Sequence, residues 1–201
     1  MEKSKILEMF FINKNQEDLL NSYINLLKEY NSHTNVVGKS TLLNPWSSHI
    51  LDSIQILPII KKSESSILDM GTGAGFPGGV LSIAGCSNVT LSDSNGKKIN
   101  FLKKVKKELN LNFNIFLGRV ETLEKKRFDI VTSRALANLN RLFSYSQKLI
   151  KKNTVLIFLK GKTVNEEILE AKKKWKFLCE VRNSLSDSRG KILIIRDLKK
   201  K

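Results

Sequence analysis

The segment Ile67–Gly78 constrains the fold of this chain more than any other, because an apolar run is followed at once by closely spaced glycines. The run ends in the carboxylate of Asp69, and glycines then occupy positions 71, 73 and 75. This order is typical of a buried strand that breaks into a glycine-rich turn and opens a helix, where a ligand approaches bare backbone. Asp93 ends a second apolar run 22 residues after Gly71, which is the place of an acidic residue that binds ribose hydroxyls. The pattern predicts a site for a nucleotide-type cofactor.

The size and composition indicate one domain with a modest appendage. The chain has 201 residues, of which 41% are hydrophobic. No stretch approaches the roughly 20 apolar residues of a membrane span, and the N-terminal residues lack the pattern of a signal peptide. The two cysteines and two histidines have no metal-ligand spacing, so we expect neither a metal site nor a disulfide framework. A monomer that works in the cytoplasm, away from membranes, is the expectation.

The net charge of +16 indicates a polyanionic partner. Lysine outnumbers arginine 28 to 7, however, and AT-rich coding DNA produces such a bias whatever the function. The charge alone therefore leaves the partner open.

The first 60 residues read as helical. One apolar stripe with helical spacing is formed by Leu19, Tyr23, Leu26, Leu27 and Tyr30. A second helix is expected from about Pro45, a favoured first-turn residue, to Leu57, because Pro58 follows. We expect residues 1–60 to form a helical segment that packs on a main domain made of residues 61–201.

From residue 65 the pattern alternates between strands and helices. The expected strands are Ser66–Met70, Val89–Asp93, Asn114–Gly118, Phe128–Ser133, Val155–Lys160, Phe177–Val181 and Lys191–Ile195. Near-continuous apolar strands separated by helices predict a parallel α/β sheet covered on both faces. The last two strands are joined by a loop too short for a helix, so one of them should run antiparallel. Five alternating units and a terminal hairpin describe the seven-stranded, Rossmann-like sheet of class I methyltransferases, and a plain dinucleotide-binding sheet lacks that hairpin.

Two cofactor classes are compatible with the glycines. Gly73, Gly75 and Gly78 satisfy the dinucleotide pattern G-x-G-x-x-G, but Pro77 removes one of the N–H donors that a pyrophosphate needs at the helix N-terminus. The carboxylate of Asp69 at the strand end would repel phosphates. It would favour the ammonium and sulfonium groups of S-adenosylmethionine, which is therefore the expected cofactor.

Further candidate residues follow the other strands. Asp93 is expected to accept hydrogen bonds from the ribose hydroxyls, with Ser94 beside it, and Asn95 is placed to cap the next helix. Val120 and Glu121 follow the third strand, where an adenine edge would lie. At the end of the fourth strand, Ser133 and Arg134 are candidates for positioning the reactants, although no catalytic residue is firmly indicated. For Arg134 the choice between binding the cofactor carboxylate and steadying the acceptor stays open.

The acceptor is expected to need little activation. The fourth strand lacks the Asn/Asp-Pro-Pro-Tyr sequence that accompanies methylation of exocyclic amino groups. Cys86 and Cys179 are not placed to act as nucleophiles on a pyrimidine carbon. A ring nitrogen with a free lone pair remains, and for it the protein mainly supplies positioning. RNA phosphates are expected to meet basic residues at the same edge of the sheet, and the candidates are Arg119, Lys160, Lys97 and Lys98.

Taken together, these residues resemble a known family, the bacterial small-subunit rRNA guanine-N-7 methyltransferases (RsmG, also called GidB). The resemblance covers most of the chain. It is carried by Asn35, His49-Ile50-Leu51-Asp52-Ser53, Asp69–Gly78, Leu91-Ser92-Asp93-Ser94, Lys97-Lys98, Phe101-Leu102, Arg119 with Glu121, Thr132-Ser133-Arg134-Ala135 and Leu159-Lys160-Gly161.

The resemblance implies methylation by S-adenosylmethionine of one guanine in small-subunit (16S) rRNA, with the rRNA or the small ribosomal subunit as partner. It also implies cofactor contacts at Gly71, Phe76, the pair Val120–Glu121 and Arg134. Ser48 stands where the family usually has arginine, and Val36-Val37 stands where it has Leu-Thr. Methylation of another RNA, a protein or a small molecule is the alternative, and a non-catalytic RNA-binding module is a third reading. His49 is expected to pack or hydrogen-bond between helix and sheet rather than to contact RNA.

Overall fold

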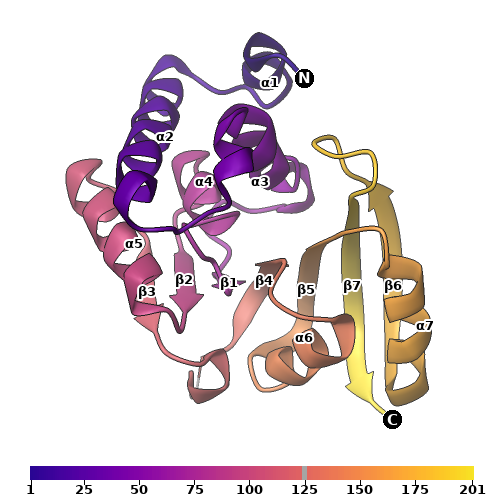
Figure 1. Ribbon diagram of the computed structural model, residues 1–201. Helices are drawn as coiled ribbons and strands as arrows, with labels where there is room; N and C mark the ends of the chain where they lie inside the picture. The colour runs from indigo at the N-terminus through magenta and orange to yellow at the C-terminus, as the bar shows by residue number, and fades with distance from the viewer. Residues whose placement is uncertain (124–125) are drawn as a thin grey trace.

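The computed structural model describes residues 1–123 and 126–201 and contains one seven-stranded sheet with the order β3-β2-β1-β4-β5-β7-β6 (Figure 1). Six strands run in the same direction, and β7 alone of the seven runs antiparallel, between β5 and β6. The expected α/β class and the antiparallel strand of the terminal hairpin are confirmed. The strands are β1 (Ile67–Met70), β2 (Val89–Asp93), β3 (Asn114–Leu117), β4 (Phe128–Arg134), β5 (Ile150–Lys160), β6 (Trp175–Asn183) and β7 (Lys191–Lys200).

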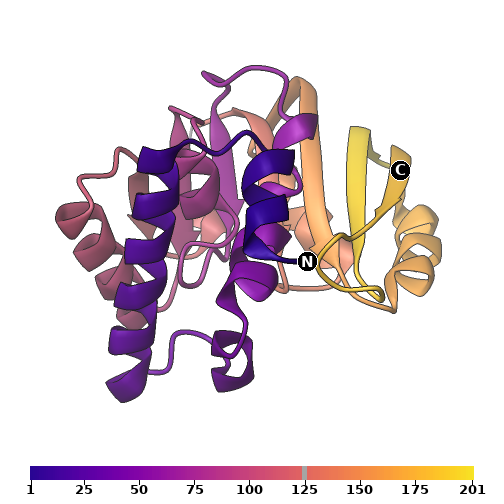
Figure 2. The same ribbon diagram turned by 90° about the horizontal axis from the view of Figure 1, so that it is seen from above.

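Helices cover both faces of the sheet (Figure 2). One apolar cluster joins the N-terminal helices to α4, α5 and one face, and a second joins α6 and α7 to the other face. Strands β1 and β2 are buried along their whole length, as expected for parallel strands between two helical layers. The helices are α1 (Lys3–Met9), α2 (Lys14–His33), α3 (Asp52–Ile54), α4 (Gly78–Ile83), α5 (Gly96–Glu108), α6 (Leu139–Ser146) and α7 (Val164–Lys174). No helix among the described residues is long and apolar enough to cross a membrane.

Helix α2 packs the N-terminal segment against the sheet layer. It begins at a capping box, in which the side chains of Asn13 and Gln16 each accept from the other residue's backbone N–H. The centre of its buried stripe is Leu20, Tyr23 and Leu27. Tyr23 and Leu27 belong to the expected stripe, whereas Leu20 is buried in place of the neighbouring Leu19. The expected stripe residues outside this centre are half-buried and pack at its margins.

The expected helix from Pro45 to Leu57 is wrong in its form. Residues Trp46–Leu51 make a wider π-helical turn, which leads directly into the short α3, and a separate 3₁₀ turn follows at Leu57–Ile59. Apolar periodicity does not encode such a widening, which is common at functional sites. Strand β5 also begins earlier than expected, because Ile150 pairs with Phe128 across an irregularity in the register.

The register brings the candidate residues to one edge of the sheet. Met70, at the end of β1, lies beside Ser92 of β2 and Ser133 of β4. Since these three strands run in parallel, the residues that follow them meet at their carboxyl ends. Ligands bind there in open α/β sheets.

Candidate active site

The glycine-rich loop after β1 is held from beneath by Asp69. This side chain is fully buried, and its carboxylate accepts from the Thr72 hydroxyl, the Gly78 backbone N–H (2.9 Å) and the Thr132 hydroxyl (3.0 Å). Burial raises the pKa of Asp69 to about 6, and the hydrogen bonds partly offset that rise. The expectation of a ligand-facing carboxylate is therefore corrected: Asp69 shapes the loop from inside the protein, because its recorded partners belong to the loop, to the start of α4 and to β4.

The loop itself is fixed by glycine conformations and by α2. Gly71, Gly73 and Gly75 all have positive φ angles, of 65°, 61° and 90°, which side-chain-bearing residues rarely adopt. The Tyr23 hydroxyl donates to the carbonyl of Ala74 (2.7 Å) from the buried face of α2. The N-terminal helices thus support the loop directly.

Asp93 lies at the end of β2, where the sequence analysis placed it. Its carboxylate accepts from the backbone N–H groups of Gly73 (2.9 Å) and Asn95 (2.8 Å). A carboxylate offers about four acceptor positions, so two remain for a ligand. Asn95 caps α5 by accepting from the N–H groups of Lys97 and Lys98, as expected. This cap fixes the turn that carries Asp93 and the exposed Ser94.

A cavity of about 330 Å³ opens on one side of Asp93. Its lining includes Val120 and the exposed Glu121, which form the short turn after β3, together with Gly71 and Ser94. Ser92 also lines it, and the Ser92 hydroxyl is buried with no hydrogen-bond partner recorded among residues 1–123 and 126–201. A buried donor without a partner is unfavourable, so a polar ligand in this cavity would satisfy it.

A second cavity of about 600 Å³ opens on the other side. It is bounded by Gly73, Phe76, His49 and Arg134, and by the loop after α2. The two cavities share Gly71, Asp93, Ser94 and Leu136. They therefore form one trough over the carboxyl ends of β1, β2 and β4, with the Leu136 side chain against Gly71 between its halves.

Arg134 is held at the end of β4 by several groups. Its Nη1 donates to Oδ2 of Asp52 (2.9 Å) and to the carbonyl of Ser48 (3.0 Å), and its Nη2 lies 3.3 Å from Nδ1 of His49. The guanidinium carbon lies 5.2 Å from the centre of the Phe76 ring. Since arginine has five N–H donors, Nε and one hydrogen of Nη2 are left without a partner among the described residues. These donors are available to a carboxylate in the second cavity.

His49 packs between the π-helical segment and the glycine loop. Its ring stacks on Phe76 at 4.5 Å between centroids, and its Nε2 lies 2.8 Å from the Thr41 hydroxyl. Burial, with a smaller contribution from Arg134, lowers the pKa of His49 to about 3, so the ring is neutral at pH 7. The expected packing and hydrogen-bonding role is what the contacts show.

Ser133 is not placed at the trough. It is buried, and its hydroxyl donates to the carbonyl of Met70 (2.9 Å), which joins β4 to β1. Its expected role in positioning reactants is therefore corrected to a structural bond within the sheet.

The candidate RNA contacts separate into two groups. Arg119 is exposed on the lining of the first cavity, and Lys98 is half-exposed on the lining of the second, whereas Lys97 is exposed and lines neither. The side chain of Lys160 is only 9% exposed, and its ammonium is bound by Glu167 (2.7 Å) and by the carbonyl of Ala137 (2.9 Å). The expectation that Lys160 holds a phosphate is corrected, because its side chain is nearly buried and two of its three N–H donors are engaged inside the protein.

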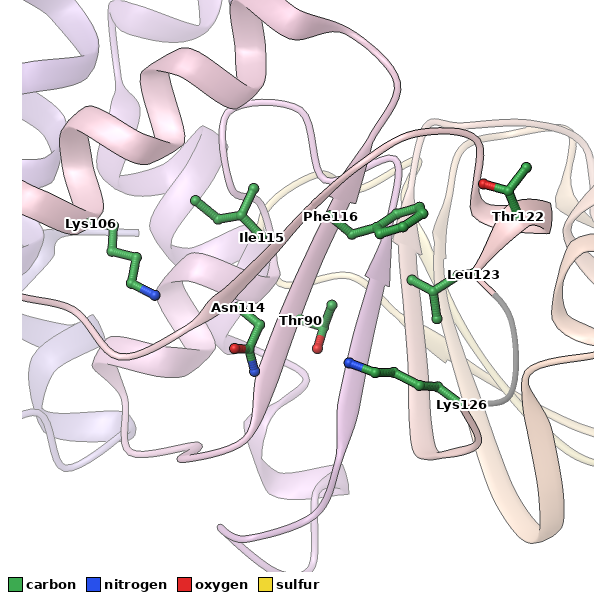
Figure 3. A pocket seen from close by; sticks show the side chains of 8 residues that line it. All are labelled: Thr90, Lys106, Asn114, Ile115, Phe116, Thr122, Leu123 and Lys126. Atoms are coloured by element: carbon green, nitrogen blue, oxygen red, sulfur yellow. The ribbon is translucent and has the colours of Figure 1, made fainter.

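A separate cavity of about 480 Å³ lies along β3, from Thr90 and Asn114 near the strand starts to Thr122 and Leu123 of the segment that follows β3 (Figure 3). Lys106, Asn114, Phe116 and Lys126 line it together with Thr90. It shares no residue with the glycine loop. The ligand position typical of such sheets is at the carboxyl ends of the strands, so we assign the chemistry to the trough.

Sequence reasoning missed several residues that build the site. Asp52 and Gln55 bind the loop of the terminal hairpin through the hydroxyl of Ser186 and the backbone N–H of Leu185. The spacing of His49, Asp52 and Gln55, three residues apart, was the available signal, because such residues share a helix face. Thr41 had no comparable signal.

Comparison with known proteins decides the family. The family profile described as "GidB: rRNA small subunit methyltransferase G" matches residues 16–195. This chain belongs to that family.

Curated GidB relatives cover nearly the full length. The ribosomal RNA small subunit methyltransferase G of Rickettsia prowazekii (strain Madrid E) is 40% identical over 90% of this chain and 94% of its own. That of Paramagnetospirillum magneticum (strain ATCC 700264 / AMB-1) is 32% identical over 98% and 97%.

Solved structures show the same fold at low identity. A ribosomal protein L11 methylase from Lactobacillus delbrueckii subsp. bulgaricus has a TM-score of 0.58 at 18% identity, covering 72% of this chain and 75% of that chain. A mutant of MtNAS in complex with S-adenosylmethionine has a TM-score of 0.61 at 14% identity, covering 90% and 75%. The expected class I methyltransferase fold is confirmed.

Proposed function

We propose that this member of the GidB family transfers a methyl group from S-adenosylmethionine to N-7 of a guanine in small-subunit (16S) rRNA. The observation that carries the proposal is the two-part trough at the carboxyl ends of β1, β2 and β4, which joins the glycine loop and Asp93 to Arg134. One half has the size and donors for an adenosine, and the other has room for a methionine end and an acceptor base.

The residues of the trough fit S-adenosylmethionine. Asp93 would accept from the ribose hydroxyls with its two remaining acceptor positions, and Ser94 lies beside it. The Ser92 hydroxyl, which has no partner among the described residues, would meet the adenine near Val120 and Glu121. The methionine end would lie along the glycine loop.

In that second half, Arg134 would bind the carboxylate of the cofactor through its free donors. Phe76 supplies an apolar wall beneath Arg134 and His49. Gly71, Gly73 and Gly75 let the ligand approach the backbone closely. The cofactor supplies a methyl group activated by a positive sulfur.

The protein's chemical task is positioning. N-7 of guanine has a free lone pair and carries no proton, so methylation there requires no general base. The described residues that line the second cavity agree with this, since its only histidine, His49, is neutral and hydrogen-bonded. Holding the two reacting atoms in line inside a shaped cavity is the expected source of rate enhancement.

The partner is inferred to be the rRNA or the small ribosomal subunit. The charge of +16, Arg119 and Lys98 on the lining of the trough, and the exposed Lys97 next to Lys98 in sequence support contact with phosphates. The proposal also includes that the protein is a monomer in the cytoplasm. Residues 1–60 would form a helical segment that packs on the domain of residues 61–201. The contacts of α2 with the glycine loop support that packing.

Methyl transfer with nucleoside analysis tests the proposal. The protein is incubated with radiolabelled S-adenosylmethionine and either 16S rRNA or small subunits that lack the modification, and the RNA is digested to nucleosides. Label in 7-methylguanosine is the expected result, and an Asp93→Ala variant serves as the negative control. Label in another nucleoside, in protein or in a small molecule would replace the proposed acceptor with the alternative one.

A further inference from the structure

The loop 36–42 lies between α2 and the π-helical segment, includes the 3₁₀ turn Lys39–Leu42 and is held at both ends. At its start, the side-chain oxygen of Asn31 accepts from the backbone N–H groups of Val36 (2.8 Å) and Val37 (3.0 Å). Near its end, Thr41 meets the buried His49 ring. This loop forms one wall of the second cavity, so its position determines the shape of that half of the trough.

The hydrogen bonds from β4 to this loop have a single compatible direction. Arginine has no acceptor, so Nη2 of Arg134 donates to Nδ1 of His49, which must be unprotonated (3.3 Å). The ring proton then lies on Nε2 and is donated to the Thr41 hydroxyl oxygen (2.8 Å). The Thr41 hydroxyl in turn donates to the carbonyl of Gly38 (2.6 Å). A neutral His49 therefore joins the cofactor end of the site to the loop.

We propose that His49 is a neutral hydrogen-bond relay that ties loop 36–42 to Arg134 and thereby positions the acceptor guanine. The loop lines the same cavity as Lys98 of α5, and its Lys39 is exposed. With the methionine end of the cofactor along the glycine loop, as proposed above, the acceptor is the reactant that this wall would meet. His49 is a positioning residue and removes no proton from the substrate. The inference rests on the function proposed above.

The surroundings of His49 keep the relay in this direction. Arg134 faces the ring from β4, Asp52 of the following helix is paired with Arg134, and Asp93 and Lys98 lie on the same cavity. Burial and Arg134 both disfavour a protonated imidazole. A protonated ring would also direct an N–H toward the guanidinium. The hydrogen bonds of the relay should therefore keep the same direction across the neutral pH range.

Two substitutions interrupt the relay without removing the groups around it. Thr41→Val keeps the side-chain shape and removes the hydroxyl, and His49→Phe keeps a ring stacked on Phe76 and removes both nitrogens. Thr41→Ser keeps the hydroxyl and is the conservative rescue. Ser40→Ala is the matched control, because Ser40 is exposed on the same loop and its hydroxyl makes no bond recorded among the described residues.

We expect Thr41→Val and His49→Phe each to raise KM for the rRNA by roughly three- to tenfold, the effect of one net hydrogen bond. The kcat and the Kd for S-adenosylmethionine should change less than twofold. The double variant should behave like a single one, because both changes break the same chain. Thr41→Ser and Ser40→Ala should match the wild type, and the rate should show no ionisation near pH 6.5.

Other outcomes overturn the relay. A loss of kcat above a hundredfold in His49→Phe, with an ionisation near pH 6.5 that disappears in the variant, would make His49 a general base. Additive effects of the two substitutions, or no effect of either, would show that this series of hydrogen bonds does not position the acceptor.

A failure of the proposed function is distinguishable from a failure of the relay. If the wild type labels no rRNA, the function fails, but the relay is still tested by hydrogen exchange on the free protein. The amides of residues 36–42 should then exchange faster in Thr41→Val and in His49→Phe than in Ser40→Ala. Equal exchange in all three variants would overturn the relay independently of activity.

Discussion

Nη1 of Arg134 lies 2.9 Å from Oδ2 of Asp52, and both side chains are about one-fifth exposed. Asp52 also accepts from the hydroxyl of Ser186 through Oδ1, so one carboxylate joins the end of β4 to the loop of the terminal hairpin. We expect Asp52→Ala to destabilise the protein by about 2 kcal/mol, the range of a charged hydrogen bond whose partner is left in place. Urea unfolding measures this change.

Asp187→Ala is the matched control for that measurement. Asp187 pairs with Arg189 at 3.0 Å on the same hairpin loop, but the pair is exposed. Exposed pairs contribute little net stability, so this variant should unfold near the wild-type midpoint. Equal losses of unfolding free energy in the two variants would show that Asp52 stabilises the protein no more than an exposed ion pair does.

Asp93→Ala should weaken S-adenosylmethionine binding by roughly a hundredfold, because two hydrogen bonds to a carboxylate contribute about 1.5 kcal/mol or more each. Isothermal titration calorimetry measures the affinity. The variant also leaves the N–H groups of Gly73 and Asn95 unpaired, so circular dichroism must first show that it is folded. A folded variant with unchanged affinity would move the ribose site away from β2.

Two glycines of the loop should respond differently to alanine. A Cβ at Gly75 would overlap the Tyr23 hydroxyl on α2, in addition to requiring a φ of 90°. We expect Gly75→Ala to destabilise the protein by about 3 kcal/mol or more. The three atoms nearest to a Cβ at Gly71 all belong to the exposed Leu136 side chain, which can move away. Gly71→Ala should therefore lower the free energy of unfolding by about 1 kcal/mol, the cost of a positive φ alone.

A second substitution tests the cause. Tyr23→Phe removes the hydroxyl that a Cβ at Gly75 would meet, at the loss of its bond to Ala74. The double variant Gly75→Ala/Tyr23→Phe should therefore be more stable than the sum of the single changes predicts, as measured by thermal unfolding. Simple additivity would place the effect of Gly75→Ala in backbone conformation and in the contact of the Cβ with Leu102.

The pH dependence of stability should reveal the neutral state of His49. Its folded pKa of about 3 lies below the usual 6.5, so the unfolded chain binds one more proton between these values. The contribution of His49 is complete above pH 6.5 and is lost as the pH falls, by up to about 1.4 kcal/mol per pH unit. Asp69 acts in the opposite sense, because its raised pKa of about 6 adds stability as the pH falls from 6 toward 3.8.

Comparing two proteins separates these contributions. His49→Phe leaves Asp69 in place and removes only the histidine, so the free energy of unfolding of the variant should fall less steeply between pH 6.5 and 5 than that of the wild type. Urea titrations at several pH values measure the two slopes. Parallel slopes would mean that His49 is protonated in the folded protein.

The sequence predicted the parts of the site that depend on residue type and order along the chain. Apolar runs located all seven strands, and the glycines with Asp93 located the trough, because both patterns reflect local conformation and burial. Contacts between distant segments left no such pattern. The meeting of Tyr23 with Ala74, of Thr41 with His49 and of Lys160 with Glu167 depends on tertiary packing. The widened turn at Trp46–Leu51 was missed because its apolar spacing resembles that of an ordinary helix.

Lys160 and Arg119 provide the final test, because they carry equal charge at the same edge of the sheet but in different surroundings. Arg119 is exposed beside the trough, whereas the Lys160 ammonium is bound by Glu167. We expect Arg119→Gln to weaken rRNA binding and to lower the slope of log K against log salt by about 0.7–0.9, the loss of one phosphate contact. Lys160→Gln removes the same charge and should leave that slope unchanged. Filter binding between 50 and roughly 200 mM salt measures both slopes. A reduced slope for Lys160→Gln would show that its ammonium leaves Glu167 and reaches the RNA.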